Sequence, residues 1–315
     1  MKVLITEIIW PVGIEKLKHY AQVEYDPSLW SNRELLLEKV KDVDAIIVRN
    51  QTKVDNILLN AGQKLKVVGR LGVGLDNIDL QTAKESNIIV AFARNANAIS
   101  VAEYVMAAML EANRPLFLAD KDVKSGNWDR KRFTGAELYQ KTIGLVGTGE
   151  IAHRVAKRAL AFGMNVVGYD PFFTEYDFPF SETGIQQVSF EELLINADFI
   201  SIHVPLIEST KNLFSKTEFK TMKKNAYIIN SSRGGIIDEQ ALYEAVTSHL
   251  IAGAYLDVLE EEPVHPVNPL LTCENVVITP HVAGLTEESQ IRTSVLVAEE
   301  VLKILQGENA LCVVK

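Results

Sequence analysis

Residues 142–171 read TIGLVGTGEIAHRVAKRALAFGMNVVGYDP. This stretch predicts a strand at 143–146, a glycine-rich turn, a helix, and a second strand at 166–169 that ends at Asp170. The turn, Gly147 to Ala152, has the G-x-G-x-x-A spacing of a dinucleotide-binding fingerprint. The same spacing alone occurs in ordinary glycine-rich turns, but the flanking strands, the helix and the acidic end together indicate a nucleotide site.

Each position of the turn has a physical role. Gly147 permits a tight turn, and Gly149 lacks a β-carbon, so a pyrophosphate can approach the backbone. Ala152 is small enough for the helix to pack closely on the strand. The first N–H groups of the helix, at Glu150 and Ile151, are expected to bind phosphate oxygens while the Glu150 side chain points to solvent.

The helix after the turn has a predicted apolar side. Its members, at steps of four, four and three residues, are Ile151, Val155, Ala159 and Phe162, and Gly163 is placed to end the helix. Asp170 follows Gly149 by 21 residues, at the end of the next strand. A carboxylate there can accept hydrogen bonds from adenosine ribose hydroxyls and would repel a 2′-phosphate, which favours NAD over NADP.

The composition is that of a globular protein with room for two domains. The chain has 315 residues, 47% of them apolar and 23% charged, and a net charge of −9. The densest basic cluster, 130–132, is short, so no nucleic-acid partner is expected. No apolar run is long enough to cross a bilayer. Cys273 and Cys312 lie far apart without metal-ligand spacing, which fits a reducing, cytoplasmic compartment and indicates neither a disulfide framework nor a metal site.

Strand-like and helix-like segments alternate along most of the chain, which predicts an α/β protein with parallel sheets. Six strands are expected in the middle of the chain, at 143–147, 166–170, 199–204, 226–230, 252–257 and 276–279. Others are expected at 3–9, 45–48, 66–69 and 88–90, and a strand-like tail at 311–314. We therefore expect two doubly wound domains: a Rossmann nucleotide domain (98–283) inserted in a flavodoxin-like substrate domain (1–97 and 284–315).

The segment between these blocks predicts a subunit contact. Ser100-Val-Ala-Glu103 has the pattern of a capping box at the start of an unusually apolar helix. A helix that is apolar on most sides is expected to be buried between domains or subunits. Residues 115–141 are expected to form an irregular arm, and we predict a homodimer built on residues 100–141.

Ionisable residues stand at three predicted strand ends, where ligands of doubly wound sheets bind. They are Arg233 in NSSRGG, Glu262 in DVLEEEP, and His281 in TPHVAG. Each has an ordinary alternative: a surface arginine, one of three solvated glutamates, or a histidine satisfied by backbone. Three such residues beside one nucleotide fingerprint favour a catalytic site. His203, in a predicted apolar strand, is expected to be a core histidine bonded to backbone.

These motifs resemble the D-2-hydroxyacid dehydrogenase family, which includes the phosphoglycerate dehydrogenases. The likeness extends over nearly the whole chain, and the spacing between the motifs also agrees. The motifs that carry it are GRLGVGLDNID (69–79), SVAEYV (100–105), the fingerprint, HVPL (203–206), NSSRGG, Glu262-Pro263 and TPHVAG. It implies a short form, without a C-terminal regulatory domain after Lys315.

The resemblance implies an NAD-dependent oxidation of a hydroxyacid. Arg233 would hold the substrate carboxylate and polarise the keto oxygen. His281 would be the acid–base group, and Glu262 would hydrogen-bond its ring, set its tautomer and favour its charged form. The resemblance also implies which residues lie along the cofactor. They include the fingerprint, Asp170, Arg233 and His281, and in addition Pro205, Thr210, Ser231, Ser232, Asp257 and Gly284. The loop Gly72-Val73-Gly74 would bind the substrate carboxylate through its N–H groups.

The substrate stays open at this point. Arg49 and Arg70 fall where phosphoglycerate dehydrogenases carry arginines, and either could bind a second anion or be an exposed loop arginine. Two features differ from the phosphoglycerate dehydrogenases: Gln51 stands where some members have a basic residue, and residues 93–103 contain no proline. The alternatives are lactate, hydroxyisocaproate, glycerate or hydroxypyruvate, and sulfolactate. A further alternative of another class is an NAD(H)-sensing, corepressor-type binding protein.

Overall fold

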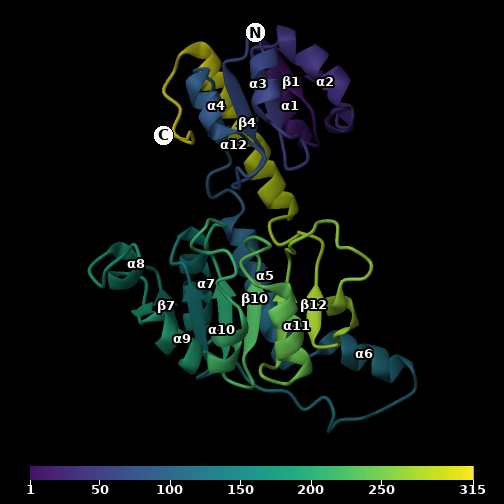
Figure 1. Ribbon diagram of the computed structural model, residues 1–315, viewed down its shortest axis with the longest axis vertical. Coiled ribbons are helices and arrows are strands. Elements are labelled where there is room, and N and C mark those ends of the chain that lie inside the picture. The colour runs from purple at the N-terminus through teal and green to yellow at the C-terminus, as the bar shows by residue number, and fades with distance from the viewer. Residues whose placement is uncertain (315) are drawn as a thin grey trace. The chain divides into compact units, whose positions relative to one another are not determined.

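The computed structural model describes residues 1–314, which form two compact units. The first contains Met1–Asn97 and the chain from Leu285 onward, and the second contains Ala98–Gly284. Figure 1 shows that the first unit takes its elements from both ends of the chain, drawn in purple to blue and in yellow. In the described part of the chain, none of the helices combines the length and the apolar character needed to cross a membrane.

The first unit is built on a five-stranded parallel sheet of order β2-β1-β3-β4-β5. Its strands are β1 (Lys2–Ile5), β2 (Gln22–Tyr25), β3 (Ala45–Val48), β4 (Val67–Arg70) and β5 (Ile89–Phe92). This is the flavodoxin-like order, so the predicted fold class is confirmed. The sequence analysis missed β2, because its four residues are exposed or half-buried and show no apolar alternation.

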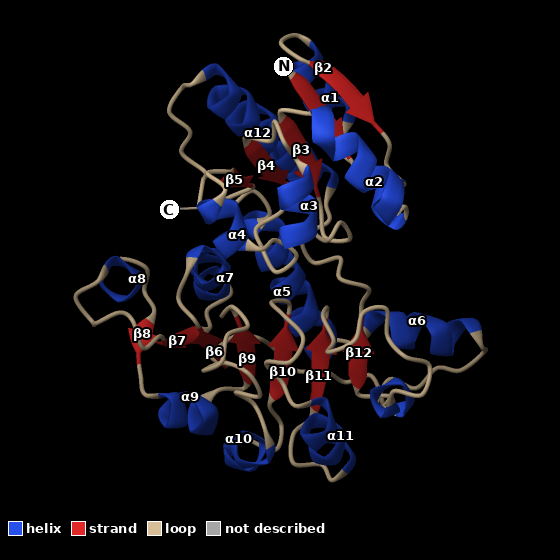
Figure 2. Ribbon diagram, turned by 45° about the horizontal axis from the view of Figure 1, so that its top comes forward, coloured by secondary structure: helices blue, strands red, loops and turns tan. Residues whose placement is uncertain are grey.

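Helices cover both faces of this sheet (Figure 2). They are α1 (Pro11–Lys18), α2 (Arg33–Lys39), α3 (Asn56–Ala61), α4 (Leu80–Glu85) and α12 (Glu287–Gln306), with short 3-10 turns at Leu29–Ser31 and Val40–Asp42. Alternate strand residues point to opposite faces. Val3 and Ile5 therefore pack with α1 and α12, whereas Leu4 and Ile46 pack with α2 and α3.

The C-terminal tail returns to this sheet after α12 ends at Gly307, which has a left-handed φ of 76°. Val313 forms an antiparallel bridge with Ala91, so the strand expected at 311–314 is reduced to one bridge. The buried carboxylate of Glu300 accepts hydrogen bonds from the N–H groups of Leu311 and Cys312, both at 2.6 Å. One side chain of α12 thus holds the tail in place.

The second unit contains a seven-stranded parallel sheet of order β12-β11-β10-β9-β6-β7-β8. Its strands are β6 (Thr142–Val146), β7 (Asn165–Tyr169), β8 (Gln186–Gln187), β9 (Phe199–Ile202), β10 (Tyr227–Asn230), β11 (Gly253–Leu256) and β12 (Val276–Ile278). This is the Rossmann order with one strand more than the six expected. The extra strand, β8, has only two residues and therefore no periodicity to detect.

Helices lie on both faces of this sheet as well. They are α5 (Ala98–Asn113), α6 (Leu116–Lys124), α7 (Glu150–Ala161), α8 (Phe178–Ser181), α9 (Phe190–Asn196), α10 (Lys216–Thr221) and α11 (Glu239–Thr247), with a 3-10 turn at Pro269–Thr272. Figure 2 shows α9, α10 and α11 along one face of the sheet and α5 and α7 along the other. Two apolar cores result, one on each face.

Three local predictions in this unit are wrong. Helix α5 begins at Ala98, so Ser100 lies inside its first turn, because Ala98 and Ile99 extend the helix toward the N-terminus. The arm expected to be irregular contains helix α6, whose apolar residues show no helical periodicity because none of them is buried. Phe162 is 46% exposed rather than part of the apolar side of α7, which ends one residue earlier.

Candidate active site

The fingerprint turn follows β6, at the point where the strand order of the sheet reverses between β7 and β9. Gly147 has a left-handed φ of 87°, and a β-carbon there would lie 2.8 Å from the His203 carbonyl oxygen. In contrast, a β-carbon on Gly149 would have no heavy atom within 4 Å among the described residues. Ala152 is fully buried behind the turn. The turn is thus tight at its base and open at Gly149, as the approach of a pyrophosphate requires.

Asp170, after β7, also contacts the fingerprint. Its Oδ2 accepts hydrogen bonds from the backbone N–H of Thr148 at 2.9 Å and from the Thr148 hydroxyl at 3.2 Å. Its Oδ1 accepts the Phe172 N–H at 3.1 Å. The carboxylate therefore stabilises the fingerprint turn from the end of β7. The Glu150 side chain is exposed, and its carboxylate forms an ion pair with Arg154, one turn further along α7.

Two of the buried polar atoms that have no hydrogen-bond partner within residues 1–314 belong to residues that directly follow strands. They are Nε2 of His203, after β9, and Oγ of Ser231, after β10. The prediction that the His203 ring is satisfied by backbone fails at Nε2, and burial lowers the pKa of this histidine to about 4. Buried polar groups are normally satisfied. Unsatisfied polar atoms at the ends of the strands next to the fingerprint strand and beyond it fit the hydroxyl- and phosphate-rich surface of a dinucleotide.

The loop after β9 holds two of the predicted cofactor residues. The Thr210 hydroxyl donates to the Pro205 carbonyl oxygen and accepts the Ile207 N–H at 2.9 Å. Both residues therefore belong to one braced loop, which follows the strand next to the fingerprint strand.

Arg233 is presented by a turn that Asn230 organises. The Asn230 side chain is 2% exposed. Its Oδ1 accepts the backbone N–H of Ser232 at 3.0 Å and the Ser232 hydroxyl at 2.8 Å, and its Nδ2 donates to the Arg233 carbonyl oxygen at 2.9 Å. Nη1 of Arg233 donates to the Ser232 carbonyl oxygen at 2.6 Å. The half-buried guanidinium is thus held close to its own turn at the end of β10.

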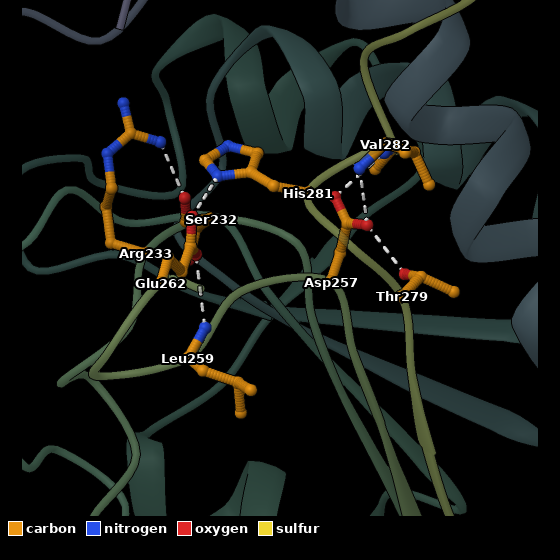
Figure 3. A network of polar contacts seen from close by, with 9 residues as sticks. Ser232, Arg233, Asp257, Leu259, Glu262, Thr279, His281 and Val282 are labelled. Atoms are coloured by element: carbon orange, nitrogen blue, oxygen red, sulfur yellow. Dashed lines mark hydrogen bonds and ion pairs between the residues drawn. The ribbon is translucent and has the colours of Figure 1, made fainter. Parts of the chain in front are cut away.

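His281 and Glu262 form a pair. His281 Nδ1 lies 2.8 Å from Glu262 Oε2, and the other carboxylate oxygen accepts the Leu259 N–H at 3.2 Å (Figure 3). Burial opposes ionisation of Glu262, but the hydrogen bond and charge of His281 outweigh it, with a smaller effect of Arg233, so the pKa of Glu262 lies below its ordinary value. Of the three consecutive glutamates, only Glu262 takes this position. Glu260 interacts with Glu239 through backbone N–H groups instead.

The backbone at His281 has an unusual conformation, with φ at 55°. Its N–H donates to the carbonyl oxygens of Asp257 and Thr279, both at 2.9 Å. The Asp257 carboxylate is 1% exposed and accepts the N–H groups of Val282 and Ala283, each at 2.8 Å. The end of β11 therefore holds the loop that carries His281, which leads into Gly284. Asp257 itself is too deeply enclosed to be a surface carboxylate.

The predicted substrate residues of the first unit surround the ends of β3 and β4. The Glu7 carboxylate, 4% exposed, accepts backbone N–H groups of Arg49 at 2.7 Å, Gln51 at 3.0 Å and Thr52 at 2.9 Å. Asn77 donates to the carbonyl oxygens of Arg49 at 2.9 Å and Thr52 at 2.7 Å, and it accepts from Arg70 Nε at 3.3 Å. One network thus connects the positions of both arginines.

The two arginines differ in their surroundings. Arg70 is 9% exposed and donates through Nη1 to the Leu71 carbonyl oxygen at 2.7 Å. Gly72 lies against it, because a β-carbon there would come within 2.2 Å of Arg70 Nη1. Burial lowers the pKa of Arg49, and the charge of Glu7 partly offsets this effect. Val73 is 38% exposed and Gly74 is half-buried, so the loop after Gly72 is accessible.

Three positioning side chains were missed by the sequence analysis: Asn230, Glu7 and Asn77. Asn230 offers a sequence signal, since an asparagine followed by serines at a strand end is typical of side-chain-stabilised turns. Glu7 and Asn77 offer none, because their partners lie far away in the sequence. Residues 1–314 contain no group of three His, Cys, Asp or Glu residues arranged to hold a metal ion.

Comparisons with known proteins agree with this geometry. A family model described as the NAD binding domain of D-isomer specific 2-hydroxyacid dehydrogenases matches residues 106–283. The chain is 47% identical over 311 residues to D-3-phosphoglycerate dehydrogenase of Methanocaldococcus jannaschii, with 98% of this chain and 58% of that protein covered. The chain therefore spans a little over half the length of that relative.

Two further proteins match along their whole length. (S)-Sulfolactate dehydrogenase of Chromohalobacter salexigens is 40% identical over 307 residues, covering 96% of this chain and 98% of that protein. The crystal structure of a glyoxylate reductase from Paecilomyes thermophila superposes with a TM-score of 0.88 at 31% identity, covering 100% and 98% of the two chains. This chain belongs to the D-isomer specific 2-hydroxyacid dehydrogenase family.

Proposed function

We propose that this protein is an NAD-dependent dehydrogenase that interconverts a D-2-hydroxyacid and its 2-keto acid. The observation that carries the proposal is the 2.8 Å contact between His281 Nδ1 and Glu262 in a unit whose sheet also bears the dinucleotide fingerprint. An imidazole bonded to a carboxylate at the end of a Rossmann sheet is suited to proton transfer during oxidation of an alcohol.

NAD, when bound, supplies the acceptor or donor of the hydride. The open backbone at Gly149 and the N–H groups of Glu150 and Ile151 would take its pyrophosphate. Asp170 would take the adenosine ribose. The remaining proposed cofactor residues, all in loops after β9 to β12, are Pro205, Thr210, Ser231, Ser232, Asp257 and Gly284.

His281 would move the proton. Because Nδ1 faces the Glu262 carboxylate, the neutral ring carries its hydrogen on Nδ1 and keeps a lone pair on Nε2. Nε2 can then accept the hydroxyl proton during oxidation and return it to the keto oxygen during reduction. Glu262 stabilises the charged ring that forms between these events.

Arg233 would orient the substrate. Its planar guanidinium can bind a carboxylate through two parallel hydrogen bonds and withdraw charge from the adjacent keto oxygen. The buried Asn230 supports this role, since it holds the turn that presents the guanidinium. A lysine would not provide the same paired geometry.

We assign the first unit as the substrate domain. Arg49 and Glu7 stand after β3 and β1, the adjacent strands at which the order of the sheet reverses, where ligands of such sheets bind. The N–H groups of Val73 and Gly74 would meet a carboxylate, whereas that of Gly72 donates to the Arg70 carbonyl oxygen at 2.9 Å. Arg49 and Arg70, tied together through Asn77, would suit a second anionic group such as a phosphate.

We therefore favour a 3-phosphoglycerate-like acid as substrate. The relative named (S)-sulfolactate dehydrogenase, which matches this chain over nearly its full length, makes a sulfonated acid the main alternative. Uncharged side chains, as in lactate or hydroxyisocaproate, would leave the arginines unused. Glycerate or hydroxypyruvate would do the same.

The test is an NADH-linked assay of the full chain with phosphohydroxypyruvate, sulfopyruvate, hydroxypyruvate and pyruvate. We expect turnover with at least one, fastest with an acid that carries a second anionic group, and its loss in His281→Gln with NADH affinity retained. NADH binding without turnover across the panel would reject the enzyme and favour an NAD(H)-sensing binding protein. A normal rate in His281→Gln would remove His281 from the mechanism.

We also propose a homodimer formed through the arm that contains α6. The side chains of Leu116, Phe117 and Leu118 are 66%, 81% and 53% exposed, and Trp128 is 77% exposed. So many large apolar side chains on one short segment mark a surface that associates with another subunit.

The two free cysteines, Cys273 and Cys312, support the cytoplasm as the location of the protein.

A further inference from the structure

A chain of hydrogen bonds runs from helix α5 to the loop that carries His281. The Tyr104 hydroxyl lies 2.8 Å from the Thr279 hydroxyl, which donates to Asp257 Oδ1 at 2.6 Å. Figure 3 shows the last part of this chain, with Thr279 and Val282 both joined to Asp257. It links three elements: α5, the end of β11 and the end of β12.

The direction of the protons follows from the chemistry of the three groups. A carboxylate only accepts, so the single hydroxyl proton of Thr279 points to Asp257. Tyr104 must then donate to Thr279. Burial, with a smaller effect from the charge of Asp257, raises the pKa of Tyr104 to about 12, so its hydroxyl keeps the proton that this donation needs.

Asp257 is the point at which this chain reaches the backbone of His281. Its Oδ1 accepts both the Thr279 hydroxyl and the Val282 N–H, and its Oδ2 accepts the Ala283 N–H. Its carbonyl oxygen accepts the His281 N–H at 2.9 Å. Rotation of the carboxylate would break the bonds on both sides of His281 together.

His281 depends on this support more than a core histidine would. Its φ of 55° lies in a region that non-glycine residues rarely occupy, and such conformations persist only when neighbouring groups hold them. Its side chain is 44% exposed, so packing constrains the ring little. The orientation of the imidazole ring is therefore determined by backbone hydrogen bonds and by the contact with Glu262.

We propose that Tyr104 and Thr279 are positioning residues for the acid–base group: they fix the Asp257 carboxylate, which holds the 281–283 backbone and aims His281 at Glu262. This inference rests on the proposed role of His281 but adds two residues that contact neither Glu262 nor the His281 ring through any hydrogen bond of the described chain. A small shift in such a ring is costly, because about 1 Å of misplacement can lower a rate about 100-fold.

The experiment compares Tyr104→Phe, Thr279→Val and Thr279→Ser in the full chain. Tyr227→Phe is the matched control, since Tyr227 packs in the same apolar cluster as Tyr104 but lies on β10, outside this hydrogen-bond chain. We expect kcat to fall roughly tenfold in Tyr104→Phe and roughly 100-fold in Thr279→Val, with KM for the keto acid and Kd for NADH changed less than about twofold. Thr279→Ser keeps the hydroxyl and should restore most of kcat.

A second readout does not need turnover. In protein labelled with ¹⁵N-histidine, the Nδ1 proton of His281, assigned by its loss in His281→Gln, reports the bond to Glu262. We expect this signal to broaden or move toward the solvent-exposed position in Tyr104→Phe and Thr279→Val but not in Tyr227→Phe. If the wild-type protein turned over no keto acid, the proposed function would fail while this measurement still decided the positioning role.

The outcomes separate a positioning role from a purely structural one. Lowered thermal stability with an unchanged kcat and an unchanged His281 signal in Tyr104→Phe would overturn the proposal. So would equal losses in Thr279→Ser and Thr279→Val, because the hydroxyl would then be irrelevant. If Thr279→Val fails to fold, the pair Tyr104→Phe and Thr279→Ser decides the question alone.

Discussion

Gly234 lies directly against Leu259: a β-carbon added to Gly234 would be 1.8 Å from the Leu259 carbonyl oxygen and 2.7 Å from the Glu260 nitrogen. The first of these residues follows Arg233, and the second begins the loop that leads to Glu262. The absence of one methyl group therefore allows the loop with the guanidinium and the loop with the carboxylate to touch. This backbone contact explains how two proposed catalytic groups, from β10 and β11, come to share one site.

Gly234→Ala should separate these loops and destabilise the second unit. Because the obstacle is backbone rather than a flexible side chain, we expect a loss of about 3 kcal/mol in the free energy of unfolding, at the upper end for overpacking. Thermal or urea unfolding measures it, and kcat should fall as well. An alanine variant as stable and as active as the wild type would show that the loops need not touch.

Gly149→Ala should behave in the opposite way. The added methyl group would have no non-neighbouring heavy atom of residues 1–314 within 4 Å, so the free energy of unfolding should change by less than about 1 kcal/mol. It would occupy the place where the pyrophosphate is proposed to approach, so Kd for NADH should rise at least about tenfold, measured by fluorescence titration. Unchanged NADH affinity would place the cofactor elsewhere.

Asp170→Asn should relax the discrimination between NADH and NADPH. Asparagine keeps an oxygen that can accept the Thr148 N–H, so the turn is preserved while the negative charge is removed. We expect the ratio of kcat/KM for NADH to that for NADPH to fall about tenfold or more, since repulsion of a 2′-phosphate would be lost. A ratio equal to that of the wild type would argue against an electrostatic role.

Glu300→Gln should loosen the C-terminal tail in a pH-dependent way. Burial would raise the pKa of Glu300, but hydrogen bonds from Cys312, Lys303 and Leu311 bring it below the ordinary value of 4.5. A lowered carboxyl pKa means that the stabilisation is complete above pH 4.5 and disappears as the pH falls through the pKa of the folded protein. We expect the variant to be about 2 kcal/mol less stable at pH 7.

Urea unfolding between pH 3 and 7 tests this dependence. The difference between wild type and Glu300→Gln should stay constant down to about pH 4.5 and shrink below it. Glu299→Gln is the control, because Glu299 is a half-buried neighbour that pairs with Lys16, and pairs open to solvent contribute little. A difference that grew as the pH fell would contradict the assignment.

Phe117→Asp should shift the oligomeric state toward monomer. Phe117 is 81% exposed on α6, and a charge there cannot be buried in an apolar subunit contact without a large cost. Light scattering should give about twice the monomer mass for the wild type and for Tyr176→Asp, a control whose side chain is 83% exposed outside the arm. A monomeric wild type, or a dimeric Phe117→Asp, would rule out a dimer built on this helix.

Much of the architecture was predictable because its signals are local. The fingerprint at 147–152 is defined by the absence of side chains at fixed spacing, and the alternation of strands and helices by apolar periodicity. Capping residues such as Ser189 and Asp238, at the starts of α9 and α11, act on N–H groups only three residues away. Elements without periodicity, such as β2, β8 and α6, could not be predicted in this way.

The amino-acid sequence on its own determined the two parallel-sheet domains, the nucleotide turn, and which strand ends carry ionisable groups, because spacing and periodicity are properties of neighbouring residues. The resemblance singles out Glu262, but only the tertiary structure shows that its carboxylate lies beside His281 while Glu260 interacts with Glu239, and that Glu7 and Asp257 hold the functional loops. These choices depend on hydrogen bonds between residues 19 to 45 positions apart, such as Glu262 with His281 and Glu7 with Thr52. Adjacent glutamates have the same chemistry, so the path of the folded backbone decides which carboxylate lies within hydrogen-bond distance of the ring.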